Sequence, residues 1–275
     1  MLLVCFDLTV VTKWILFIFF WFILPIFSDP FVIGEKFEYK IRWGFVTLGR
    51  SSMSIIGTKN YGRTKCLILQ TKAIGSPWIN SFFPVNDEII SHWEPIQMKP
   101  YYSEKNLNEG NYHRHHKIYY DPIKKIANYK QKKFSGNTNK KGELRKDAKW
   151  VFKNGITKNL PDDFQDILSA IYFNRANSTK GEPGKVFYIN LYDDLKITKL
   201  KMVILKRESV VLEVNEKKTK FHAIIVQPFI KTTGIFRAKG DMFLWISDDR
   251  KRIPLKITSS VPYVGKVEVE LNKMQ

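Results

Sequence analysis

Side-chain polarity alternates with a period of two residues along most of the chain after Gly34, and this pattern constrains the fold more than any other feature. Residues 37–43, FEYKIRW, place apolar side chains at the odd positions and charged side chains at the even positions. Because successive side chains of a strand point to opposite faces of a sheet, this segment predicts a strand with one buried and one solvated face. Comparable runs return up to residue 271, separated by Gly, Asn, Asp or Pro, so the sequence predicts an antiparallel meander.

About fourteen runs are expected as strands, and no linker divides them convincingly. They lie near residues 37–43, 46–56, 64–73, 87–94, 97–106, 112–120, 123–130, 185–192, 196–206, 209–215, 219–230, 235–246, 252–260 and 263–271. Residues 130–150 are polar and basic and are expected to form a long hairpin tip or loop. A sheet of this size usually curls or closes, because open edges pair with other chains. We therefore expect residues 29–275 to form a single β domain, a large curved antiparallel sheet that makes a barrel or half-barrel.

One segment, PDDFQDILSAIYFNR at residues 161–175, has a helical period instead. Its apolar residues recur at i, i+3, i+4, i+7 and i+8 and are Phe164, Ile167, Leu168, Ile171 and Tyr172. This spacing predicts one amphipathic helix over residues 162–174, with Pro161 in its first turn. A barrel of more than about eight strands is too wide for side chains alone to fill, so the helix or an apolar ligand is expected to occupy the hollow.

The first 28 residues differ from the rest of the chain. Residues 14–27, WILFIFFWFILPIF, carry no charge and follow Lys13. Their length suits the apolar region of a signal peptide, roughly 7 to 15 residues, better than a spanning helix of about 20. We expect residues 1–28 to be a signal peptide or, alternatively, an uncleaved N-terminal membrane anchor, and the protein to be exported to the periplasm or the envelope. Cleavage would leave Cys66 without a cysteine partner in the chain.

The formal net charge of +19 at pH 7 would attract phosphates of nucleic acid or of anionic lipid. Lysines scattered over solvent-facing strand positions explain the same total, and export argues against nucleic acid. We therefore expect an apolar ligand or an anionic lipid surface as partner and no nucleic acid, and leave protein partners open.

Catalytic signals are sparse. A strand would place His113 and His115 on one face, and Asp87 could supply a carboxylate, so a hydrolase or metal-dependent enzyme using these three residues is one alternative. A third metal ligand is not evident, and neither a Gly-rich phosphate loop nor a G-x-S-x-G elbow occurs. We therefore expect no metal, no cofactor and no enzymatic activity.

Asp248 and Asp249 lie between two alternating runs. Side chains of adjacent residues in a tight connection diverge and cannot share a proton as a catalytic dyad would. We expect the pair to fix a hairpin turn through local backbone hydrogen bonds and to pair with Arg250 or Arg252.

Four segments, residues 34–53, 82–95, 166–175 and 244–271, resemble in this order the characteristic blocks of an exported bacterial family, domain of unknown function 3108 (DUF3108). The residues that match its motifs are Trp43, Gly44, Gly49, Pro84, Asp87, Ser169, Ala170, Trp245, Asp248, Asp249, Arg252, Ile253 and Pro254. Ile167 stands where the family has a proline after Asp166. The resemblance implies a Gram-negative envelope protein with a large curved antiparallel β structure, and it implies no activity.

Two functions of non-enzymatic type follow from this reading. In the first, the concave face holds an acyl chain or lipid, with Phe37, Tyr39, Phe164, Ile171 and Trp245 as candidate ligand contacts. In the second, the helix fills the hollow and the protein is a structural or protein-interaction module. A cavity smaller than about 300 Å³ would favour the second, because ligand pockets usually exceed that size.

Overall fold

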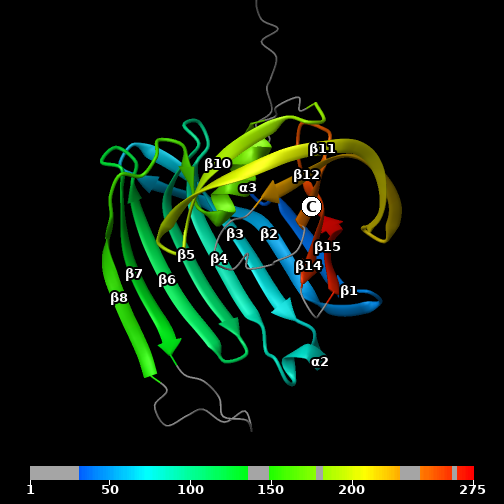
Figure 1. The fold of residues 1–275 in the computed structure, drawn as a ribbon, viewed down its shortest axis with the longest axis horizontal. Helices are drawn as coiled ribbons and strands as arrows, with labels where there is room; N and C mark the ends of the chain where they lie inside the picture. The colour runs from blue at the N-terminus through cyan, green and yellow to red at the C-terminus, as the bar shows by residue number, and fades with distance from the viewer. Residues whose placement is uncertain (1–30, 136–148, 178–181, 230–241, 262–264) are drawn as a thin grey trace, which may run out of the picture. The chain divides into compact units, whose positions relative to one another are not determined.

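The computed structural model of the protein describes residues 31–135, 149–177, 182–229, 242–261 and 265–275. Over these ranges the chain forms one 15-stranded sheet with the order β8-β7-β6-β5-β4-β3-β2-β1-β15-β14-β13-β12-β11-β10-β9 (Figure 1). The strands are β1 (Lys36–Trp43), β2 (Val46–Tyr61), β3 (Thr64–Gly75), β4 (Asn86–Glu94), β5 (Lys99–Glu109), β6 (Tyr112–Asp121), β7 (Ile126–Ser135), β8 (Lys149–Thr157), β9 (Phe164–Gln165), β10 (Val186–Asp193), β11 (Lys196–Val214), β12 (Lys217–Phe229), β13 (Met242–Ser247), β14 (Pro254–Val261) and β15 (Gly265–Met274).

The sheet is a meander whose two halves join where β1 pairs with β15, with Tyr39 opposite Leu271. All neighbouring strands are antiparallel except β9 and β10, which pair in parallel over two residues. The prediction of a mainly β chain built on a large antiparallel sheet is confirmed, and the sheet is not closed into a barrel.

The two halves of the sheet meet through side chains. The turn between β10 and β11 reaches β5 and β6, where Asp193 pairs with Lys105 and Asp194 with Arg114. The Thr157 hydroxyl of β8 lies 2.6 Å from the Tyr192 hydroxyl of β10. These contacts curl the open sheet without joining its edge strands by a backbone ladder.

The long helix α3 spans Ile167–Ala176, so the prediction of a helix over 162–174 was wrong at its start. Phe164 and Gln165 instead form β9 against β10, and Asp166 begins the helix as its N-cap. A short helix, α2 (Pro77–Asn80), was not predicted.

Three strand predictions also need correction. Strand β8 was not predicted, and only Lys149 and Trp150 of it fall in the segment 130–150 that was expected to be a hairpin tip or loop, while β7 extends into that segment as far as Ser135. The two strands predicted at 196–206 and 209–215 are one strand, β11, with a register shift between Ile204 and Lys206. Residues 136–148 and the starts of the strands predicted at 235 and 263 lie outside the described residues.

The leader predicted at residues 1–28 also lies outside the described residues and stays a prediction. Of the helices in the described ranges, none is long and apolar enough to cross a membrane.

The main core lies between α3 and strands from both halves of the sheet. Leu168 and Tyr172 on one side of α3 pack with Phe37, Leu69 and Trp93. The other side of the helix turns Ala170 toward a second aliphatic cluster on β10 to β13. The helix is therefore held between two layers, and its second side positions the candidate site.

Candidate ligand-binding cavity

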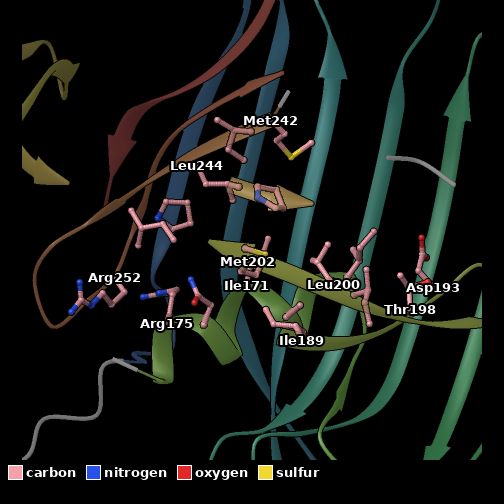
Figure 2. Close-up of a pocket in the computed structure, with 18 of the residues that line it drawn as sticks. Ile171, Arg175, Ile189, Asp193, Thr198, Leu200, Met202, Met242, Leu244 and Arg252 are labelled. Carbon is pink, nitrogen blue, oxygen red and sulfur yellow. The ribbon is translucent and has the colours of Figure 1, made fainter. Parts of the chain in front are cut away.

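A cavity of about 460 Å³ lies beside α3, bounded by β10, β11, β13 and β14 (Figure 2). Most of its lining is aliphatic or thioether: Ile167, Ala170, Ile171, Ile189, Leu191, Leu200, Met202, Met242, Leu244, Ile246 and Ile257. Several of these side chains are only partly buried, because they face this space rather than packed neighbours. The arrangement is that of an apolar ligand pocket, which in proteins has a volume of about 300 to 1,000 Å³.

The first turn of α3 is fixed by a buried carboxylate. Asp166 Oδ1 accepts hydrogen bonds from the backbone N–H groups of Leu168 (2.9 Å) and Ser169 (3.0 Å), and the Ser169 hydroxyl accepts one from the Asp166 N–H (2.9 Å). The Ser91 hydroxyl of β4 donates to Asp166 Oδ2 at 2.6 Å. Burial raises the pKa of Asp166, and these hydrogen bonds act in the opposite direction. The capping box therefore joins the helix start to the sheet.

The last turn of α3 is fixed by Arg175, whose side chain is almost fully buried. Its guanidinium donates to both oxygens of Glu35, at 2.6 and 2.8 Å, and Nε donates to the Lys251 carbonyl at 3.0 Å. The cation lies 4.9 Å from the Tyr172 ring centroid. One side chain thus ties the helix end to the residue before β1 and to the β13–β14 turn.

The β13–β14 turn has the role predicted for its aspartates. Asp249 Oδ1 accepts from the backbone N–H groups of Lys251 (2.9 Å) and Arg252 (3.1 Å). Asp248 pairs with Arg252 (2.9 Å) and with Arg207 of β11 (3.0 Å). The turn places Arg252 and Pro254 on the wall of the cavity.

Charged groups lie at two sides of the cavity. Figure 2 shows Arg175 and Arg252 at one side, Asp193 and Thr198 at the other, and the labelled apolar side chains between them. The two arginines and Asp193 each have an ionic partner, and the middle of the cavity is apolar.

Of the five residues predicted to contact a ligand, Ile171 lines the cavity. Phe37 and Tyr39 lie in the main core beneath the other side of α3. Phe164 packs against Tyr120 with ring centroids 5.1 Å apart. Trp245 is not among the lining residues, unlike its sequence neighbours Leu244 and Ile246, and its Nε1 donates to Glu208 at 2.7 Å.

The aliphatic residues of β10, β11 and β13 that line the cavity were missed by the sequence reasoning. Their signal was present as alternate apolar positions, such as Leu200 and Met202 or Leu244 and Ile246. Alternating polarity identifies the apolar face of each strand, but it does not show whether that face packs against other side chains or borders a cavity.

The residues of the enzyme alternative contact other side chains and backbone groups, and His113 and Asp87 share Asn108 as a partner. His113 Nδ1 lies 3.0 Å from Asn108 Oδ1, and His115 Nε2 lies 2.8 Å from Glu104 Oε1. Asp87 Oδ1 accepts from the Asn108 backbone N–H at 2.7 Å. Within the described ranges no three His, Cys, Asp or Glu residues form a group that could hold a metal ion.

Titratable side chains outside the cavity also have shifted pKa values, among them Cys66 and Glu109. Burial raises the pKa of the Cys66 thiol to about 12, so the thiol stays protonated near neutral pH. Burial, with the neighbouring Asp87 carboxylate, raises the pKa of Glu109 to about 7.

Family-motif glycines and prolines hold turns and close strand contacts. Gly44 has φ +56° in the β1–β2 turn after Trp43, a conformation that glycine adopts readily. A Cβ atom on Gly49 would lie 2.4 Å from the Ile74 carbonyl oxygen, so only glycine allows β2 and β3 to approach here. The Pro84 carbonyl accepts from the Gly110 N–H at 2.7 Å, which ties the α2 loop to the β5–β6 turn.

Comparisons with known proteins concern family and fold. The crystal structure of a beta-barrel-like protein of domain of unknown function DUF1849 from Brucella abortus is similar, with 9% sequence identity, 88% of this chain and 95% of that chain covered, and a TM-score of 0.49. No curated protein sequence matches the chain. The family model described as protein of unknown function (DUF3108) matches residues 38–272, and the chain therefore belongs to the DUF3108 family.

Proposed function

We propose that this protein is an exported, non-enzymatic protein of the cell envelope that binds an acyl chain or another apolar ligand in the cavity beside α3. The observation that carries the proposal is the cavity itself, whose volume of about 460 Å³ exceeds the limit of about 300 Å³ below which a filled core would be favoured. The export part rests on the uncharged run at residues 14–27.

The chemistry of the lining supports an apolar ligand. Leu200 and Met202 of β11 and Met242 and Leu244 of β13 face α3 across the space (Figure 2). Each methylene that moves from water into such a site contributes about 0.8 kcal/mol. Thioether side chains adapt to ligands of different shape, which suits a pocket for flexible chains.

The rival function, an interaction module with a filled core, is separated from ligand binding by native mass spectrometry of protein purified from membranes under mild conditions. We expect an adduct that disappears after solvent extraction and whose extract contains an acyl lipid. A clean apoprotein mass from membrane-purified protein would contradict the proposal.

A cavity-filling variant tests where the ligand lies. Leu244→Trp should weaken binding of a fluorescent fatty acid by about tenfold, because it displaces ligand volume worth about two methylenes. Val211→Trp is the matched control, since Val211 is exposed and does not line the cavity. Equal binding by both variants, with thermal unfolding confirming that each is folded, would place the ligand elsewhere.

A further inference from the structure

Exposed aromatic side chains gather at one end of the sheet. In the described part of the chain, the three tryptophans with exposed side chains are Trp43, Trp78 and Trp150. The three most exposed phenylalanines of the described residues accompany them: Phe45 at 100% exposure, Phe152 at 72% and Phe82 at 65%. We call these six residues the aromatic end.

Hydrogen bonds and strand register place these residues at the same end. Trp43 pairs with Val46 across the β1–β2 turn, and Trp78 Nε1 of α2 donates to the Thr47 carbonyl at 3.3 Å. Trp150 lies at the start of β8, opposite Phe134 near the end of β7. Figure 1 shows α2 and these ends of β7 and β8 along the lower end of the sheet.

The opposite end has a different surface. Its turns, between β2 and β3, β4 and β5, and β6 and β7, expose the aliphatic residues Ile96 and Ile123 and, in the described ranges, no tryptophan or phenylalanine. Because isolated apolar side chains are ordinary on a surface, Ile96 and Ile123 need no partner. The six large aromatics lie along one end of the sheet, on β1 and its turn to β2, on α2 and the residues after it, and on edge strand β8, and together they mark an interaction surface.

Charge identifies the partner of this surface. Strands β7 and β8 carry Lys130, Lys132, Lys133, Lys149 and Lys153 and no carboxylate. Lys132 Nζ lies 4.2 Å from the Trp150 ring centroid, so aromatic and cationic groups share one surface. Tryptophan beside lysine is the composition that anchors proteins at the interface between lipid headgroups and acyl chains.

Carboxylates near this end reduce its positive charge little. Asp87 and Glu109 lie on strands β4 and β5 and are partly buried, and Glu268 is paired with Lys256 and Lys266. With the chain at +19 overall, anionic headgroups are favoured over neutral ones, at about 1 kcal/mol for each lysine near the surface.

We propose that the aromatic end docks on a phospholipid membrane that contains anionic lipids. The fully exposed Phe45 stands on the β1–β2 hairpin turn, where it can enter the headgroup layer. One side of the cavity faces this end, because its lining residue Met242 pairs with Ser259, Ser259 with Val267, and Val267 with Trp43. Three strand spacings, about 14 Å, separate Met242 from Trp43.

A polarity-sensitive fluorophore on either end of the sheet tests this contact. The full chain with Cys5→Ser is labelled through Phe45→Cys or, as the control, through Ile123→Cys, while Cys66 is fully buried and stays unlabelled. If other residues attach the chain to the membrane, they do so in both labelled proteins. The difference in emission between the labels at 45 and 123 therefore reports which end of the sheet faces the membrane.

With vesicles of phosphatidylcholine and phosphatidylglycerol, the label at position 45 should shift to the blue and the label at 123 should not. Lys132→Glu with Lys149→Glu should weaken vesicle binding at least tenfold, since two attractive contacts become repulsive. Equal shifts at both positions, or none at 45, would overturn the proposal. A concentration-dependent shift at 45 without vesicles would assign the surface to a second copy of the chain, and would overturn it as well. Loss of the shift in a protein that still binds fatty acid would refute membrane docking without affecting the ligand proposal.

Discussion

The buried ion pair between Arg175 and Glu35 gives the sharpest test of how α3 is held beside the cavity. The side chains are 1% and 9% exposed, and the guanidinium binds both carboxylate oxygens. Removing one partner of such a pair leaves a buried charge without its counterion and costs about 3 to 5 kcal/mol. Glu35→Gln and Arg175→Met should therefore each lower the free energy of unfolding by this amount.

The double variant separates the ion pair from simple loss of packing. Once both charges are gone, no uncompensated charge remains, so the two losses should not add, and the coupling free energy should be at least about 2 kcal/mol. In thermal unfolding, each single variant should melt roughly 10 °C lower, since about 2 to 4 °C correspond to 1 kcal/mol in a domain of this size.

The surface pair Lys72–Glu88 supplies the matched control. Its atoms lie 3.4 Å apart and its side chains are 50% and 31% exposed, so its removal should cost less than about 1 kcal/mol. Additive losses at Arg175 and Glu35, or losses no larger than those of the control pair, would refute the reasoning that this pair fixes the end of α3.

Three further predictions concern the cavity and pH. Saturated fatty acids should bind about fourfold more tightly per added methylene until the cavity is full, and a flat series in a fluorescence displacement assay would argue against an apolar site. Because the folded-state pKa of Glu109 is raised to about 7, the free energy of unfolding should fall as pH rises from about 4.5 to 7. For a half-exposed group we expect this fall to be on the order of 1 kcal/mol. Urea unfolding of Glu109→Gln should show no such dependence on pH. Burial, with Arg114 and Lys105 nearby, lowers the pKa of His116 to about 3, so the stability present above pH 6.5 should be lost as pH falls. Between pH 6.5 and 5 the loss should be about 2 kcal/mol and should be absent in His116→Leu; an unchanged slope would mean that His116 is not the titrating group.

The alternation of polarity predicted the sheet because burial of one face leaves a period of two along each strand. Strand β8 was missed because it lies at the sheet edge with most of its side chains exposed, so KWVFKNGIT has no buried face to reveal. The helix start was misplaced because Phe164 fits the helical stripe equally well. Its pairing with Asn190 in β10 is a tertiary contact that local spacing does not encode.

The site was harder to predict than the sheet, and strand β13 shows why. Leu244 and Trp245 are adjacent, so they point to opposite faces, and both are apolar enough to be buried. The larger aromatic was the natural candidate for a ligand contact, yet its indole N–H needs an acceptor and finds Glu208. An aliphatic side chain has no such requirement and can border an empty space without an unsatisfied polar group. The cavity exists because α3 fills only part of the space inside the curved sheet. The position of α3 is fixed by the capping box at Asp166 and the ion pair of Arg175, and their partners Ser91 and Glu35 are distant in the sequence.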